Sequence, residues 1–499
     1  IVGRNRGEIT GSTVGNKDKT GSIITARSGF VGGVAGSNSG SISTSGGLDT
    51  QRLVKQINAW LEVPYKEETT TDENGNKVTT KVVDTDKQNA NLNQMVRVLT
   101  GKASGDAETK LQTDFKAMQG FDTLTYGDKN YDTVYTNRSV NQLLVSLRGG
   151  SGWGHFANGY LGGITGFNDV TGQITDSASG QWFVYADNIN QSWGAVGGVI
   201  GQNESDAESN SGLVNFAAVR RFVRGKGRWD GRYNASNDDD ANVGCEEYST
   251  NANLVDNYVG GVIGTQENRT GDRWTLEKCV NIGTVFNSRS NNAGGVLAYW
   301  LSYGGTLTNC YNFGEITTNS NNGLSSGTVG GVAGYFNNPV AGTAANLYRC
   351  SNYGSVKKMT YGANDVGGIF GKVQMENKDD AMTINIAECV NGSNVKLDGS
   401  NMSAGIFAYI GPYNLIPHVE VNIDRCRNYC YDLGGTITSG IFGNRGNPRS
   451  TQAGMKKTTI TNCFSLVNKY RSYDRAIAYG GNTNSLDGYN NYYMDKYSF

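Results

Sequence analysis

Short apolar segments alternate with Gly-, Asn- and Ser-rich segments along most of this chain. A hexapeptide of the form Val-Gly-Gly-Val/Ile-x-Gly begins at Val31, Val196, Val259, Val329 and Val366, with looser copies at Leu161, Ala293, Ser403, Thr438 and Asp474. From Val259 to Asp474 successive copies lie 34, 36, 37, 37, 35 and 36 residues apart. Runs rich in Val, Ile and Tyr between such turn residues predict strands rather than helices. The regular spacing predicts a repeat protein with coils of about 36 residues.

A second motif, Cys-x-Asn, recurs in step with the hexapeptide. It pairs Cys279 with Asn281, Cys310 with Asn312, Cys350 with Asn352, Cys389 with Asn391 and Cys426 with Asn428, and Cys463 begins a weaker copy. One coil cannot bury its apolar face, but stacked coils can, with equivalent residues about 4.8 Å apart. We therefore expect an interior column of cysteines and a parallel ladder of asparagine amides.

These patterns predict an all-β parallel β-solenoid with an α-rich insertion. Residues 1–46 form the first coils, 47–150 the insertion, and 151–480 the main solenoid with a long loop at 202–258. Residues 481–499 are rich in aromatic side chains and are predicted to cap the last coil.

The insertion has its own pattern. Asp49 is placed to cap a helix with its apolar face formed by Leu53, Val54, Ile57, Trp60 and Leu61. A hairpin is predicted over 66–83, followed by helices ending at Gly101 and Gly120 and a second hairpin at 123–135. The spacing of Val140, Leu143, Leu144 and Leu147 predicts a last helix.

Composition narrows the function classes. The 499 residues include 70 Gly and only 5 Pro, which suits tight turns and continuous hydrogen-bonded ladders. The formal net charge of −1 gives no field that favours nucleic acid. No apolar run is long enough to span a bilayer.

Six of the eight cysteines fall in one phase of the repeat. Neighbours one coil apart would need a strained bridge, so we predict buried free thiols rather than a disulfide framework. Cys426 and Cys430 are only four residues apart, which leaves open a local bridge or a reactive Cys430. Without a CxxC motif or clustered histidines, no metal or other cofactor is predicted.

A basic and aromatic run is the strongest local candidate for ligand binding. It contains Arg221, Arg224, Lys226, Arg228 and Trp229. Arginine pairs with carboxylate, sulfate or phosphate groups, and tryptophan can stack on a sugar face. The alternative is that the run pairs with the acidic loop at Asp238–Asp240 and packs on the solenoid.

The Gly-Gly hexapeptides with their Cys-Tyr-Asn segments resemble the GLUG-motif repeats of bacterial surface and secreted proteins. Such repeats also occur in the non-catalytic region of immunoglobulin A metallopeptidases. The resemblance covers about 1–46 and 151–480. It implies export and a right-handed β-helix, and it transfers no catalytic residue, because the HExxH zinc motif is absent.

The sequence therefore predicts a non-catalytic extracellular or bacterial cell-surface module, an adhesin or stalk. Its expected partner is a host glycan or a host or bacterial surface protein, bound through the insertions. One alternative is a carbohydrate-active β-helix enzyme, a polysaccharide lyase or hydrolase, which needs carboxylates at equal phase in neighbouring coils; no such set is evident. Another is the accessory solenoid of a large secreted metallopeptidase.

Overall fold

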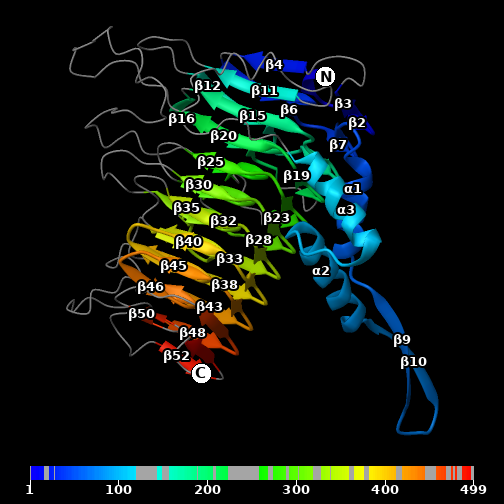
Figure 1. Ribbon diagram of the computed structural model, residues 1–499, viewed down its shortest axis with the longest axis vertical. Helices are drawn as coiled ribbons and strands as arrows, with labels where there is room; N and C mark the ends of the chain where they lie inside the picture. The colour runs from blue at the N-terminus through cyan, green and yellow to red at the C-terminus, as the bar shows by residue number, and fades with distance from the viewer. Residues whose placement is uncertain are drawn as a thin grey trace.

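The computed structural model describes most of the chain. It covers 2–15, 22–26, 28–119, 143–148, 157–187, 189–205, 210–222, 258–267, 274–287, 292–301, 303–318, 327–337, 339–358, 365–375, 381–411, 418–443, 457–467, 474–475, 478–479, 486–489 and 491–495. Within these residues the fold prediction is confirmed: parallel sheets stack coil on coil as a β-solenoid (Figure 1).

Each coil passes through up to five sheets, named here by their first strand. The β1 sheet contains β1 (Val2–Asn5), β6 (Ala35–Asn38), β13 (Thr165–Asn168), β17 (Ile200–Asn203), β22 (Ile263–Glu267), β27 (Leu297–Leu301), β32 (Ala333–Asn337), β37 (Phe370–Gln374), β42 (Phe407–Gly411), β47 (Phe442–Gly443) and β51 (Ala478–Tyr479). The β2 sheet contains β2 (Glu8–Thr10), β7 (Ser41–Ser43), β14 (Gln173–Thr175), β18 (Asn210–Ser211), β23 (Trp274–Glu277), β28 (Gly305–Thr308), β33 (Thr343–Tyr348), β38 (Met382–Ala387), β43 (Val419–Asp424), β48 (Lys457–Thr461) and β52 (Leu486–Tyr489).

The other three sheets complete the coil. The β19 sheet contains β19 (Val214–Asn215), β24 (Val280–Asn281), β29 (Tyr311–Asn312), β34 (Ser351–Asn352), β39 (Val390–Asn391), β44 (Arg427–Asn428), β49 (Phe464–Val467) and β53 (Tyr492–Asp495), and a separate pair, β3 (Thr13–Val14) and β8 (Gly46–Gly47), lies in earlier coils. The β4 sheet contains β4 (Ser22–Ala26), β11 (Leu143–Arg148), β15 (Trp182–Asp187), β20 (Ala218–Phe222), β25 (Val285–Asn287), β30 (Ile316–Thr318), β35 (Val356–Lys358), β40 (Lys396–Asp398) and β45 (Asp432–Gly434). The β5 sheet contains β5 (Ser28–Gly32), β12 (Ala157–Gly162), β16 (Ile189–Gly197), β21 (Tyr258–Gly260), β26 (Asn292–Gly294), β31 (Thr328–Gly330), β36 (Asp365–Gly367), β41 (Met402–Ala404), β46 (Ile437–Ser439) and β50 (Asp474–Arg475).

The Gly hexapeptide forms the turn between the β5 and β1 sheets. At Gly260 an added Cβ would lie 1.8 Å from the carbonyl oxygen of Ile263, and at Gly261 it would lie 2.0 Å from the carbonyl oxygen of Gly295 in the next coil. No side chain fits at such a distance from a backbone atom, so glycine is required where one turn lies directly on the next.

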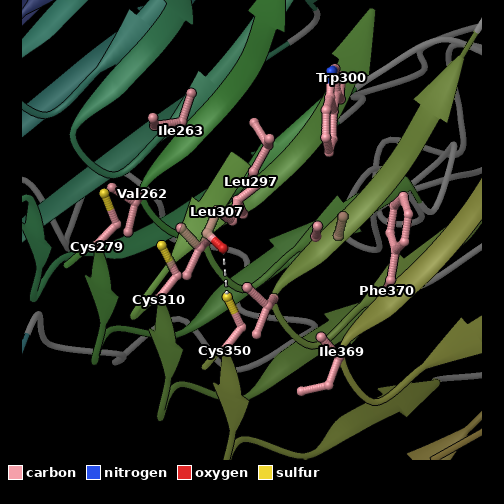
Figure 2. Packing of buried hydrophobic residues seen from close by; sticks show 14 of the residues in the cluster. Val262, Ile263, Cys279, Leu297, Trp300, Leu307, Cys310, Cys350, Ile369 and Phe370 are labelled. Carbon is pink, nitrogen blue, oxygen red and sulfur yellow. Dashed lines mark hydrogen bonds between the residues drawn. The ribbon is translucent and has the colours of Figure 1, made fainter. Parts of the chain in front are cut away.

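Interior columns of like residues form the core. Phe370, Phe407 and Phe442 stack on consecutive coils, with ring centroids 5.1 Å apart at each step. Figure 2 shows the cysteines of three coils beside the aliphatic and aromatic side chains of the same core. The coils hold together because each apolar face is covered by its own repeat one turn away.

The insertion contains the three helices of the described residues and a hairpin. The helices are α1 (Gln51–Leu61), α2 (Thr85–Leu99) and α3 (Gly105–Met118), and the hairpin joins β9 (Tyr65–Thr71) to β10 (Lys77–Val83). The predicted apolar face of α1 is buried against Phe216, Val280 and Tyr311 on the outside of the β19 sheet. The helices therefore lie along one side of the solenoid (Figure 1).

Two local predictions in the insertion are wrong. Asp49 does not cap α1: it has a left-handed φ of 61°, and Thr50 occupies the N-cap position, where its hydroxyl donates to Gly47 O. The last predicted helix is strand β11, which pairs with β4 and β15. The solenoid thus resumes at Leu143 rather than at 151, and the predicted hairpin at 123–135 lies outside the described residues.

Two other segments also contribute more to the solenoid than predicted. The predicted loop at 202–258 contains β18, β19 and β20, which complete a coil, and 223–257 lies outside the described residues. In the predicted cap, β52 and β53 pair in parallel with β48 and β49. This segment therefore adds one strand to the β2 sheet and one strand to the β19 sheet.

Candidate functional site

The predicted basic and aromatic run is only partly within the described residues. Arg221 lies in β20, where its backbone pairs with Ala186 and Asn287. Arg224, Lys226, Arg228 and Trp229 lie outside the described residues, so their role in binding stays a prediction. Arg220, the residue before Arg221 in β20, is buried. Its guanidinium carbon lies 5.4 Å from the ring centroid of Phe286.

The structure places the six periodic cysteines in one buried column. Backbone pairing brings the Cys279 and Cys310 coils into register, and the same register continues to Cys463. The thiols lie near backbone carbonyls of the preceding coil, as for Cys350 Sγ and Leu307 O at 3.4 Å (Figure 2). All seven cysteines within the described residues, Cys430 included, are free and buried, so the structure has no bridge between Cys426 and Cys430.

Burial raises the pKa of Cys430 to about 12, and it raises the pKa values of Cys310 and Cys389 well above the ordinary value. For Cys350 and Cys426, burial is outweighed by hydrogen bonds from the neighbouring cysteines, which lower the pKa. None of these thiols is accessible from solvent. A reactive cysteine needs an accessible thiolate. The column is therefore structural, and Cys430 is an inert thiol.

The asparagines form a continuous hydrogen-bonded ladder beside the cysteines. Each side-chain amide donates to the next: Asn215 to Asn281, then to Asn312, Asn352, Asn391 and Asn428, over distances of 2.7, 2.7, 2.8, 3.0 and 2.9 Å. Ser179 precedes the ladder and Ser465 follows it. All these amides are buried, so the ladder fixes the register of the core.

The sequence did not reveal a second amide ladder in the earlier coils. Asn5 donates to Asn38, Asn38 to Asn168, Asn168 to Asn203 and Asn203 to Gln266, over 2.8, 2.8, 2.7 and 2.6 Å. On the next coil the same position is Trp300, so the column changes from amides to apolar side chains. The signal was an Asn seven residues after the start of each early hexapeptide, as in Val31 to Asn38.

The outer face of the β1 and β5 sheets has a cluster of aromatic rings. Phe30 on β5 stacks on Tyr160 of β12, with centroids 5.6 Å apart and planes 5° apart, and on Phe167 of β13 at 4.8 Å. Phe30 is 47% exposed, and Tyr160 and Phe167 are half-buried. We call these three residues the aromatic platform. Its rings come from adjacent sheets of a rigid core, so their positions are preorganised.

Aromatic and polar side chains continue along the same outer column. From Phe167 the register runs through Gln202, Thr265, Tyr299, Tyr335, Lys372 and Tyr409. The ammonium of Lys372 lies 5.5 Å from the ring centroid of Tyr335 and 5.3 Å from that of Tyr409. Burial lowers the pKa of Lys372, and the carboxylate of Asp365 opposes that shift.

Two carboxylates occupy equal phase on neighbouring coils of this face. The side-chain amide of Gln202 donates to Glu204 at 2.7 Å and to Glu267 at 3.1 Å. Glu204 is buried and Glu267 half-buried. The hydroxyl of Thr265, on the same column as Gln202, is buried and has no hydrogen-bond partner within the described part of the chain. We call Gln202, Glu204, Thr265 and Glu267 the carboxylate cluster.

The prediction that no carboxylates lie at equal phase is therefore wrong. The residues of the cluster lie at the ends of two near-identical segments, VGGVIGQNE at 196–204 and VGGVIGTQE at 259–267. Both segments begin with the hexapeptide, but the 63-residue interval between them hid that they lie on neighbouring coils, because later copies on neighbouring coils lie about 36 residues apart. Aligning each hexapeptide with the three residues after it would have found the pair.

Among the described residues, no group of three or more His, Cys, Asp or Glu side chains is arranged to hold a metal ion. No helix in the described ranges has the length and apolar character needed to cross a membrane. Comparison with protein-family models, curated proteins and solved structures found no match to this chain.

Proposed function

We propose that this chain is a non-catalytic binding module of a bacterial surface or secreted protein, an adhesin or stalk, and that the aromatic platform binds a glycan. The observation that supports binding is the stack of the exposed Phe30 on the half-buried Tyr160 and Phe167, from two adjacent sheets of the solenoid. An aromatic face packs well against the apolar C–H face of a sugar ring. The solenoid supports the stalk role, because stacked coils make an elongated rod.

The export and surface location belong to the proposal. They are supported by the GLUG-like spacing of the Gly hexapeptides and the Cys-x-Asn motif. The site predicted from the sequence is a second place where the same ligand class can bind, since its arginines suit acidic sugars. It comprises Arg221, Arg224, Lys226, Arg228 and Trp229. The platform is the better supported of the two, because its three rings are in mutual contact, with Phe30 and Tyr160 on paired strands.

A glycan array and titration calorimetry test this proposal. Replacing Phe30 with alanine removes the exposed ring at the centre of the platform, and we expect roughly a tenfold or greater loss of glycan affinity. The matched control is Tyr431→Ala, because Tyr431 is 45% exposed and lies away from the platform, between β44 and β45. Equal affinities of the Phe30→Ala variant and the wild-type protein would contradict the proposed site.

The second candidate function is that of a polysaccharide lyase or hydrolase, and it is favoured by the carboxylate cluster. Two carboxylates on one face are the usual acid and base pair for cleaving glycosidic bonds. Turnover of a polyuronate or host glycan by the purified chain tests this. If the chain is an enzyme, Glu204→Gln and Glu267→Gln each abolish turnover, while Asp398→Asn on the β4 sheet leaves it unchanged. If the wild-type chain shows no turnover, this candidate fails.

A further inference from the structure

The hairpin of the insertion projects away from the helices and from the strands of the solenoid (Figure 1). Figure 1 shows β9 and β10 extending past the helices, clear of the solenoid. The side chains of β9 are all exposed, and on β10 only Val82 is half-buried. Seven residues per strand give a ribbon that reaches about 23 Å.

An isolated two-stranded ribbon is only marginally stable in water and usually needs a third strand or a packing surface. This one is nevertheless well specified by its sequence. Both strands are rich in β-branched residues. At the turn, the Asp72 carboxylate accepts hydrogen bonds from the backbone N–H groups of Asn74 and Asn76, over 2.9 and 2.8 Å. Among the described strands, β9 and β10 pair only with each other, and a well-formed ribbon with unpaired outer edges is a surface for strand addition.

The charges along the two strands favour the β10 edge of the hairpin for pairing with a second copy. If two β10 strands pair antiparallel with Thr80 at the centre, every residue of the strand finds a partner: Val78 faces the second copy's Val82, Thr79 faces its Lys81 and Lys77 faces its Val83. No like charges lie opposite each other in this register. Centring on Thr79 instead would place Lys77 opposite Lys81, which is unfavourable.

Strand β9 does not have this property. Its full-length self-pairing is centred on Glu68, which would place that carboxylate opposite its own copy. Glu67 and Glu68 lie side by side in β9. Like charges directly opposite destabilise a strand pair, so the β9 edge disfavours self-association.

We propose that two copies of this chain associate through their β10 edges and form a four-stranded antiparallel sheet in the order β9, β10, β10, β9. One face of that sheet gathers Val78 and Val82 from both copies, of which Val78 is 40% exposed in the single chain. The apolar contact of these valines supplies the packing that the lone hairpin lacks. The pairing is isologous, as expected for a two-fold dimer.

Sedimentation velocity and disulfide trapping of the full chain test the dimer. The central register places the two Thr80 Cα atoms about 4.5–5.5 Å apart, within the range that a disulfide spans. We therefore expect Thr80→Cys to form a covalent dimer on mild oxidation. The matched control is Thr69→Cys on β9, which lies on the outer edge of the four-stranded sheet and should stay uncrosslinked. The native cysteines of the described residues are buried and do not interfere.

A charge exchange separates this register from other contacts. Val78→Lys and Val82→Glu should each weaken dimerisation roughly tenfold, because each places a charge opposite a valine of the second copy. Within the hairpin, position 82 pairs with Lys66 and position 78 with Thr70, so neither change puts like charges opposite each other in the single chain. The double variant should regain the dimer, since the ammonium introduced at position 78 faces the carboxylate introduced at position 82 of the second copy. A chain that is monomeric at all concentrations overturns the proposal. So does a dimer unaffected by these changes, or equal trapping of Thr80→Cys and Thr69→Cys.

Discussion

Asn312 shows what a single residue of the amide ladder does. Its side chain makes hydrogen bonds to Asn281, to Asn352 and to both backbone polar groups of Gly314. A buried amide with fewer partners would cost more than it contributes. The ladder is stable because each coil from Asn215 to Asn428 supplies the same amide at the same position.

Replacing Asn312 with alanine should therefore lower the free energy of unfolding by roughly 3 kcal/mol, since several buried hydrogen bonds are lost together. Urea denaturation followed by circular dichroism measures this. The control is Asn385→Ala, because Asn385 bonds Asn346 and Asn422 in a half-buried outer ladder. We expect the control to lose less than about 1 kcal/mol. Equal losses in both variants would count against the buried ladder.

Glu108 links stability to pH. The guanidinium of Arg97 and the backbone N–H of Ser104 hold the pKa of this carboxyl at about 2, below its ordinary value of 4.5. A lowered folded-state pKa gives stability that is present above the unfolded pKa and lost as the pH falls through the folded one.

Packing of α2 on α3 should thus weaken as the pH drops from about 4.5 to about 2. Thermal unfolding at a series of pH values, followed by the circular dichroism of the helices, measures this loss. In Glu108→Gln this part of the pH dependence should disappear. If the variant keeps the wild-type slope over that range, another carboxyl is responsible.

At the scale of elements, sequence patterns predicted the first helices and the hairpin but not β11. Leu143, Leu144 and Leu147 have helical spacing, yet Leu143, Val145 and Leu147 point into the core and Leu144 and Ser146 are buried as well. A strand that is buried on both faces does not alternate apolar with polar residues, so the spacing of its apolar residues can match that of a helix. The prediction that Asp49 caps α1 was wrong for a different reason. The hydrogen bond from Thr50 to Gly47 depends on backbone geometry that the sequence pattern does not show.

The helical insertion depends on Trp60. Its ring stacks on Phe115 of α3 at 5.7 Å, and its indole N–H donates to Gln94 of α2 at 2.8 Å. Replacing Trp60 with alanine should destabilise the insertion by about 3–5 kcal/mol, because a large buried ring is lost from between the helices.

Hydrogen exchange read by mass spectrometry checks this prediction. Helices α1 to α3 should lose protection in Trp60→Ala, while β33 and β38 in the solenoid stay protected. The control is Arg52→Ala, which removes an exposed ion pair with Asp114 and should change little. Loss of protection throughout the solenoid would contradict a separately stabilised insertion.

For the whole molecule, periodicity predicted the solenoid and the identity of its inner columns. It could do so because a buried position carries the same type of residue at the same phase of successive coils, as in the cysteines from Cys279 to Cys463. It did not predict the aromatic platform, whose rings meet because β12 and β13 pair with β5 and β6 in register although the whole insertion lies between them in the chain. Surface clusters of this kind depend on which strands become neighbours, and the repeat alone does not reveal them.

The fold requires equivalent residues of successive coils to lie directly above one another, and cross-linking across one coil tests this most directly. Thr306 of β28 and Asn346 of β33 are paired residues on the outer face, and Asn385 lies one coil further. A short bifunctional thiol reagent should join the cysteines of Thr306→Cys/Asn346→Cys, about 4.8 Å apart. It should fail with Thr306→Cys/Asn385→Cys, at about twice that distance. Equal cross-linking in both variants, or none in the first, would contradict the stacked register.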